Sequence, residues 1–139
     1  WVREAVAGND IPSVYAGATV FCCPSIYEPF GITNLEAMAS CTPVVATRTG
    51  GIPEIVVQGE TGYLVDIEPI SAADPEAKDP ARFAQGLADA MNRILTNPDL
   101  AHRMGLASRK RVEEKFSWKS IAAQTLSFYE ETIAKFRHT

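Results

Sequence analysis

Three short apolar runs, separated by segments with helical spacing, constrain the fold of this 139-residue chain more than any other feature. They cover 18–24, 43–47 and 62–65. Apolar runs of this length, without alternation, are expected of strands that are buried on both faces. Helices predicted over 32–40 and from Ile52 onward lie between the runs. The order strand, helix, strand, helix, strand predicts an α/β fold with a parallel sheet, right-handed crossovers and flanking helices.

Outside these runs the first part of the chain adds a short helix and a loop. The helix is predicted to open on Asp10 and to carry Pro12 in its first turn, where proline is tolerated. The acidic segment 66–80 contains three prolines and shows no periodicity. We interpret it as a solvated surface linker.

Three helices are expected after this loop, so the chain should end in a helical part. Phe83 begins an apolar face that continues to Leu95, and the pair Asn97-Pro98 ends that helix. A second helix is predicted over 104–112, and Ser117 caps a third. One side of the third helix carries residues that we interpret as packing, in the core or on a docking surface, rather than as a cofactor site: Trp118, Ile121, Ala122, Thr125, Tyr129, Ile133 and Phe136.

Charge and composition exclude several classes of function. The net charge is −4 and the pI is about 5.2, whereas a general nucleic-acid binder carries a basic surface. No apolar run approaches the ~20 residues of a membrane span. Cys22, Cys23 and Cys41 lack metal-ligand spacing and indicate reduced thiols in a cytoplasmic protein. His102 and His138 lie far from any motif, so we expect neither a metal site nor a Ser/His triad.

The length fits one domain. The chain starts at Trp1 and lacks an initiator methionine. We therefore expect residues 1–139 to be a single truncated domain taken from a longer protein.

The segment 24–40 is the first candidate site, because it runs from a strand through a loop into a helix. Ligands of an open parallel sheet collect beyond the carboxyl ends of its strands. Gly31 permits a close approach of the backbone, and Ile32 and Thr33 would offer free N–H groups to a phosphate at the helix start. Glu36, one turn along, could accept hydrogen bonds from both hydroxyls of a ribose. Glu28 would face a group on the far side of the phosphate.

A purely structural explanation of this segment is also open. Thr33 and Glu36 fit a capping box, in which Thr33 is the N-cap and Glu36 reaches back to its N–H. Glu28 alone could be a solvated loop carboxylate. The capping box does not explain the rigid, apolar approach Pro29-Phe30-Gly31.

Gly50 and Gly51 form the second candidate site. They follow a buried strand, and their backbone can come close to a ligand at the same mouth of the sheet. Pro53 and Glu54 suit the first turn of the next helix, so a tight strand-to-helix connection is the alternative explanation. That alternative accounts for the double glycine only in part.

The sequence Glu28-Pro-Phe-Gly-Ile-Thr-Asn-Leu-Glu36 resembles the E-x₇-E motif of retaining GT-B glycosyltransferases, above all glycosyltransferase family 4 and the glycogen synthases. The resemblance covers about 24–65 and includes 43–46, 50–54 and 59–62. The loop 74–80 and Phe116-Ser117-Trp118 are similar to the actinobacterial glycogen-synthase type.

The resemblance implies a Rossmann-like C-terminal domain that binds a nucleotide-sugar. Glu28 would be the catalytic-site residue, against hydroxyls of the donor sugar near its reacting carbon. Residues 30–33 (Phe30, Gly31, Ile32 and Thr33) would lie along the donor and its diphosphate, and Glu36 would bind the donor ribose. Gly50 and Gly51 would approach the sugar or phosphate through their backbone. The family needs no metal and no further cofactor. Its main catalytic task is to stabilise the charge that grows on the nucleoside diphosphate.

Departures from the family pattern limit what this chain can do alone. The basic residues that the family places on the diphosphate have no clear counterpart, since Arg3 is the only basic residue before the motif. The acceptor-binding domain and the first strands of the C-terminal domain are missing. We expect the chain alone to be inactive. Exposed strand edges would favour a homodimer or a swapped assembly.

The leading hypothesis for function is glucosyl transfer from ADP-glucose or UDP-glucose to an α-glucan such as glycogen. Two alternatives stay open. The first is a mannosyl- or glucosyltransferase that acts on a lipid or a small acceptor. The second is a non-catalytic nucleotide-binding module.

Overall fold

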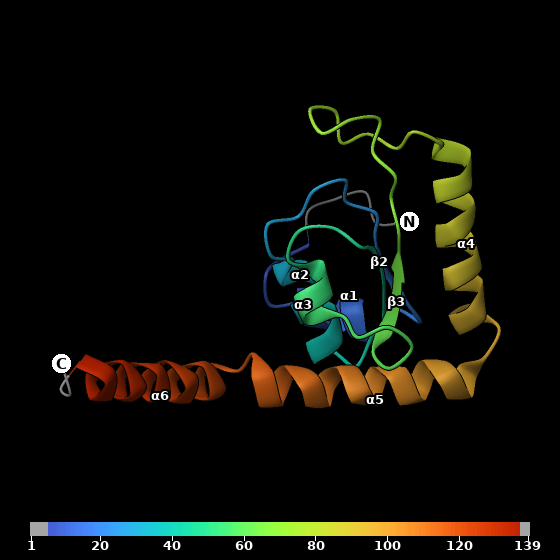
Figure 1. The fold of residues 1–139 in the computed structure, drawn as a ribbon. Coiled ribbons are helices and arrows are strands. Elements are labelled where there is room, and N and C mark those ends of the chain that lie inside the picture. Colours follow the sequence, from blue (N-terminus) through green and yellow to red (C-terminus); the bar gives the residue numbers. More distant parts are fainter. Residues whose placement is uncertain (1–5, 137–139) are drawn as a thin grey trace.

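The computed structural model describes residues 6–136 and has a three-stranded parallel sheet with helices against both faces (Figure 1). The strands are β1 (Phe21–Cys23), β2 (Val44–Thr47) and β3 (Gly62–Val65), in that spatial order. Cys23 pairs with Ala46 in the register of β1 and β2. The predicted α/β fold, with its parallel sheet and flanking helices, is confirmed.

Helices before and between the strands lie near their predicted positions. α1 (Ile11–Ala16) precedes β1 and has proline in its first turn, but the Asp10 side chain makes no cap hydrogen bond. α2 (Ile32–Ala39) connects β1 to β2, and α3 (Ile52–Ile55) connects β2 to β3. Each crossover joins parallel neighbours, as predicted from the order of elements.

Strand β2 divides the apolar side chains into two clusters. Every residue of β2 is buried. Val44 and Ala46 belong to the cluster that contains α2 and α3, whereas Val45 belongs to the cluster beside α4. Alternate residues of a strand point to opposite faces, so a central strand with both faces covered reads as one continuous apolar run.

The two helices after the loop pack against the sheet domain. α4 (Pro80–Leu95) starts at the Asp79 cap, which accepts a hydrogen bond from the Arg82 amide at 3.0 Å. α5 (Pro98–Lys115) starts at the Asn97 cap, which accepts from the Leu100 amide at 3.0 Å. Asn97-Pro98 therefore begins the next helix as well as ending α4, so α5 is longer than the predicted 104–112.

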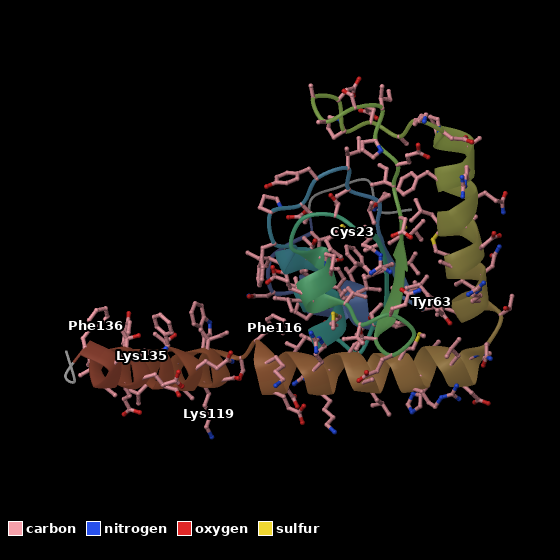
Figure 2. The ribbon with its side chains drawn as sticks, in the orientation of Figure 1. Cys23, Tyr63, Phe116, Lys119, Lys135 and Phe136 are labelled. Atoms are coloured by element: carbon pink, nitrogen blue, oxygen red, sulfur yellow. The ribbon has the colours of Figure 1, made fainter. Side chains whose placement is uncertain are left out.

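The last helix does not pack in the core of the described residues, so of the two expected kinds of packing only a docking surface stays open. α6 (Trp118–Phe136) extends away from the sheet domain (Figure 1) and contains no buried residue. Ser117 caps it as predicted, since the Ser120 amide donates to Ser117 Oγ at 3.2 Å. In Figure 2, Phe136 and Lys119 point to opposite sides of α6. The amphipathic pattern is real, but no described element covers its apolar side.

The loop over residues 66–79 is more structured than the predicted linker. Glu68 and Lys78 form an ion pair at 2.9 Å, and the Lys78 amide donates to the Glu68 carbonyl at 2.8 Å. An isolated antiparallel bridge joins Pro69 and Ala77. The loop is closed by its own hydrogen bonds, although most of its residues are exposed.

None of the helices within residues 6–136 is both long enough and apolar enough to span a membrane.

Candidate functional site

The start of helix α2 forms the centre of the candidate site. Gly31 is its N-cap and has a left-handed backbone, with φ at 104°. Asn34 is the first helical residue whose amide bonds back to the Gly31 carbonyl, at 3.0 Å. The amides of Ile32 and Thr33 precede it, and no hydrogen bond to another described residue occupies them. Free N–H groups with the partial positive charge of a helix start can bind a phosphate.

The capping-box explanation of this helix start is wrong. Thr33 lies inside the first turn of α2, one position past its first residue, and is not the N-cap. The Glu36 carboxylate does not bond to the Thr33 amide, and instead accepts a hydrogen bond from the Tyr15 hydroxyl. Neither Thr33 nor Glu36 therefore has the capping role that was the alternative to ligand binding.

Gly31 is required by what lies beneath it. A Cβ at this position would lie 2.6 Å from Nδ2 of Asn34 and 3.5 Å from Cγ of Glu28. Asn34 is fully buried, and neither of its amide atoms has a hydrogen-bond partner among the described residues. A Cβ at position 31 would displace the buried Asn34 amide, whereas its distance to Glu28 is an ordinary van der Waals contact. The sequence singled out Gly31 for its approach to a ligand but gave no signal for Asn34.

The loops that follow β1 and β2 are joined to each other, and the double glycine makes this contact. Gly51 N donates to the Glu28 carbonyl at 2.9 Å, and Thr49 Oγ1 donates to the Ile26 carbonyl at 3.1 Å. A Cβ on Gly50 would lie 1.9 Å from the Glu28 carbonyl oxygen. A Cβ on Gly51 would lie 2.6 Å from the Pro29 carbonyl oxygen. The pair is needed for this loop junction, which brings Glu28, Gly31, Gly50 and Gly51 together.

Phe30 connects this junction to the end of α5. Its ring lies 6.3 Å from the ring of Phe116, and the Arg111 guanidinium lies 5.7 Å from the Phe116 ring. Arg111 also donates to the carbonyls of Ile55 and Glu54, at 2.7 and 2.8 Å. Arg111 therefore binds the last carbonyls of α3, the helix that Gly50 and Gly51 lead into. The contacts of Phe30 with Phe116 and of Arg111 with α3 join residues more than 50 positions apart, and local patterns did not predict them.

Glu36, one turn along α2, faces a groove. The groove has a volume of about 340 Å³ and is lined from α1, α2 and α5 by Ile11, Pro12, Tyr15, Glu36, Ser40 and Arg109. The Tyr15 hydroxyl donates to Glu36 Oε2 at 3.2 Å. The pKa of Tyr15 is raised, first by partial burial and then by the neighbouring Glu36 carboxylate. Both effects favour the protonated hydroxyl, which is the form that donates to Glu36. Sequence reasoning did not identify Tyr15.

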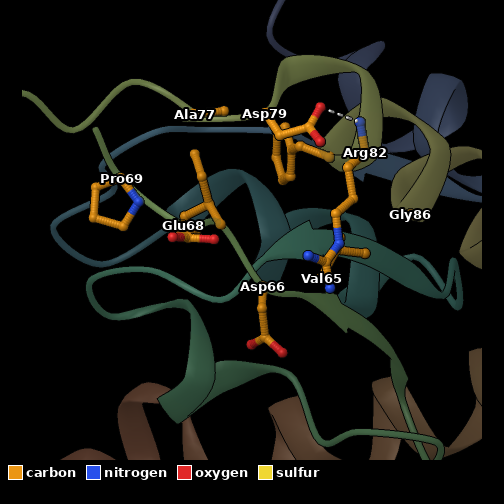
Figure 3. A pocket seen from close by; sticks show the side chains of 10 residues that line it. Val65, Asp66, Glu68, Pro69, Ala77, Asp79, Arg82 and Gly86 are labelled. Atoms are coloured by element: carbon orange, nitrogen blue, oxygen red, sulfur yellow. Dashed lines mark hydrogen bonds between the residues drawn. The ribbon is translucent and has the colours of Figure 1, made fainter. Parts of the chain in front are cut away.

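A second hollow, of about 520 Å³, lies between the end of β3, the loop 66–79 and the first turns of α4 (Figure 3). Its acidic groups already have partners. Asp66 pairs with Arg48 at 2.7 Å and Glu68 with Lys78 at 2.9 Å, while Asp79 caps α4. This hollow is separate from the loop junction and contains none of the predicted site residues.

The two histidines and three cysteines do not form a metal site in the described part of the chain. Within residues 6–136, no group of three or more His, Cys, Asp and Glu side chains is arranged to hold a metal ion. The cysteines in this part are free thiols, and His102 lies on α5. His138 and Arg3, which the sequence also singled out, lie outside the described residues.

The sequence of this chain is similar to those of known proteins. Residues 4–111 match the protein family described as glycosyl transferases group 1. The alpha-maltose-1-phosphate synthase of Mycolicibacterium smegmatis is 48% identical over 134 residues, which are 96% of this chain and 33% of that protein. The chain thus spans about a third of the length of this curated relative.

Two solved structures have the same fold. Sucrose-phosphate synthase of Thermosynechococcus elongatus aligns with a TM-score of 0.68 at 38% identity, over 88% of this chain and 27% of that one. The Anabaena protein Alr3699/HepE, solved in complex with UDP and glucose, aligns with a TM-score of 0.68 at 25% identity, over 87% of this chain and 29% of that one.

Proposed function

The chain belongs to the group 1 glycosyl transferases, and from that premise we propose that it is the donor-binding, C-terminal domain of a retaining GT-B glycosyltransferase. The observation that carries the proposal is the loop junction. There Glu28 and the double glycine meet beside the open amides at the start of α2. This arrangement lies at the carboxyl edge of the parallel sheet, where such folds bind nucleotides.

The diphosphate of the donor binds at the start of α2 in this proposal. The amides of Ile32 and Thr33 offer hydrogen bonds, and the Thr33 hydroxyl adds a donor. The bond that breaks joins the sugar to this diphosphate, so negative charge grows on the phosphate oxygens during transfer. Fixed amide dipoles stabilise that charge without having to reorganise. No metal ion or other cofactor is required for this role.

Glu28 and the double glycine bind the sugar end of the donor. The main chain of Glu28 is held by Gly51, so its side chain starts from a fixed point. Its carboxylate accepts hydrogen bonds from donor hydroxyls near the reacting carbon. Phe30 closes the loop on one side through its contact with Phe116. Gly50 and Gly51 present only backbone to the sugar or phosphate.

The nucleoside end extends along α2 to Glu36. In this proposal the Glu36 carboxylate, which lines the groove between α1 and α2, accepts hydrogen bonds from the two hydroxyls of a ribose. We propose ADP-glucose or UDP-glucose as the donor. The structural match to a protein solved with UDP and glucose supports a glucosyl nucleotide, and it does not distinguish the two bases.

The acceptor has two candidates. The resemblance of 74–80 and 116–118 to glycogen synthases favours an α-glucan such as glycogen. Two relatives are named as synthases of maltose 1-phosphate and of sucrose phosphate, and both of these products are phosphorylated disaccharides. Their names favour a sugar phosphate as the acceptor instead. We propose the sugar phosphate as the acceptor, because the more similar of these two relatives is 48% identical over nearly the whole chain. The glucan is the second candidate.

Activity requires more than this chain in our proposal. The acceptor site and the basic residues for the diphosphate come from the remainder of the protein, so the 139-residue chain alone is expected to be inactive. Within the described residues, β1 and β3 each have a strand on one side only. A dimer formed through these edges is a further proposal, and light scattering at several concentrations would reject it by showing monomer throughout.

Transfer assays on the full-length protein test the function. ADP-glucose, UDP-glucose and GDP-mannose would each be offered with glucose 1-phosphate, with glycogen and without acceptor. We expect glucosyl transfer to the sugar phosphate and a kcat about 10- to 100-fold lower for Glu28→Gln, the effect of losing a hydrogen bond to a charged group. Glu60→Gln, in an exposed turn, is the matched control.

The outcomes separate the alternatives. Transfer to glycogen alone would replace the sugar phosphate by the second candidate. Preference for GDP-mannose would overturn the glucosyl donor but leave the domain assignment intact. Nucleotide binding without transfer to any acceptor would support the non-catalytic module.

A further inference from the structure

The hydrogen bond between Tyr15 and Glu36 joins two residues that line one groove. The Tyr15 hydroxyl donates to Glu36 Oε2 at 3.2 Å across 21 positions of sequence. Glu36 is exposed on α2, where a glutamate side chain normally samples several rotamers. A hydrogen bond to one oxygen restricts this motion. It leaves the other oxygen of the carboxylate available to a ligand.

Tyr15 is itself fixed from two directions. The centroids of its ring and the Phe21 ring lie 5.4 Å apart, with an interplanar angle of 85°. Its carbonyl accepts a hydrogen bond from Thr42 Oγ1 at 2.7 Å. β1 therefore holds the ring, and the segment before β2 holds the backbone. A side chain held in this way can orient a neighbour on α2.

The hydroxyl and the ring of Tyr15 have separable roles. The ring packs on the cluster that contains Met38 and Ile52, as a phenylalanine ring would. The hydroxyl adds little to that packing, and it donates its hydrogen bond to Glu36. A tyrosine at this position is thus explained by the carboxylate rather than by the core.

We propose that Tyr15 is a positioning residue that holds the Glu36 carboxylate toward the groove, so that it can bind the ribose hydroxyls of the donor. The proposal rests on the proposed role of Glu36 in donor binding. Tyr15 does not take part in the transfer itself. The hydrogen bond from Tyr15 reduces the loss of side-chain entropy that Glu36 undergoes when the nucleotide binds.

Nucleotide affinity, measured by calorimetry on the full-length protein, tests the proposal. ADP and UDP would each be compared with their 2′,3′-dideoxy analogues. For Tyr15→Phe we expect about 3- to 10-fold weaker binding of ADP or UDP, the effect of one net hydrogen bond. The dideoxy analogues should bind Tyr15→Phe and the unaltered protein equally. Tyr129→Phe, at an exposed position on α6, should bind every ligand normally.

The double variant distinguishes positioning from a general loss of structure. In Tyr15→Phe with Glu36→Gln, affinity should fall no further than in Glu36→Gln alone, because the two residues act as a unit. Additive losses, or equal losses for the ribose and dideoxy ligands, would overturn the positioning role. So would unchanged affinity in Tyr15→Phe when Glu36→Gln weakens binding. Unchanged affinity in Glu36→Gln would instead refute the ribose role on which the proposal rests.

Discussion

Strand β2 and helix α6 differ in what surrounds their apolar side chains. All four residues of β2 are buried between two helical layers, whereas α6 has no buried residue over its 19 positions. Trp118 is 89% exposed at one end of α6, and Phe136 is 77% exposed at the other. Both elements were recognised in the sequence by their apolar residues. The difference shows that an apolar pattern predicts a face that favours contact. Whether that face is buried depends on the other elements of the chain.

The loop junction depends on the buried sheet, and Gly50→Ala should therefore have the largest effect. The new Cβ would lie 1.9 Å from the Glu28 carbonyl oxygen, in a backbone with φ at +50°. Backbone strain and overpacking together should lower the free energy of unfolding by about 3–5 kcal/mol. Urea unfolding of the chain measures this loss.

Gly59→Ala is the matched control for the junction. Gly59 also has a left-handed backbone, with φ at +76°, but no atom lies within 4 Å of the new Cβ. Only the conformational penalty of about 1–2 kcal/mol should remain. If both variants lost the same stability, the contact between the two loops would not be tight in solution.

The sequence predicted best those parts of the fold that local patterns encode. Val44 to Thr47 form a continuous apolar run and became the central strand, and β3 has the predicted bounds of 62–65. The predicted start of α2 at Ile32, directly after Gly31, is confirmed, whereas the alternative with Thr33 as the N-cap is wrong. The helix starts at Ile11 and Ile52 were also found, whereas Asn97-Pro98 was predicted only to end α4, so the start of α5 was missed.

The parts that failed involve contacts between distant residues. Nothing near Tyr15 indicates a bond to Glu36, and nothing near Arg111 indicates the carbonyls of α3. Asn34 looks like an ordinary helix residue, yet it is fully buried beneath Gly31. The periodicity of α6 was recognised, but its exposure depends on which elements lie beside it. Such facts are set by tertiary structure, because a local pattern does not state its partner.

Arg111→Gln should give the second largest effect, because Arg111 connects α5 to the loop side of the sheet. The variant loses charged hydrogen bonds to the carbonyls of Glu54 and Ile55. Hydrogen bonds of this kind contribute about 1.5–3 kcal/mol each, and partial solvent exposure should keep the total near ~2 kcal/mol. Thermal and urea unfolding would both show the loss.

Arg103→Gln on the same helix is the control for charge. Arg103 is exposed, and within residues 6–136 no hydrogen bond or ion pair involves its side chain. Its substitution should change the free energy of unfolding by less than ~0.5 kcal/mol. Equal effects of the two variants would mean that the contact between Arg111 and α3 does not stabilise the domain.

The smallest effect is expected on α6, where Ile133→Gln tests the comparison directly. Ile133 is 52% exposed, whereas Ile94 on α4 is fully buried. In the 139-residue chain, Ile133→Gln should change the free energy of unfolding by no more than ~0.5 kcal/mol, because glutamine keeps helix propensity and little apolar contact is lost.

Ile94→Gln makes the same exchange in the core and should cost at least ~3 kcal/mol, since it removes a buried aliphatic side chain and buries an amide. A loss above ~2 kcal/mol for Ile133→Gln would show that α6 packs against other parts of the chain in solution.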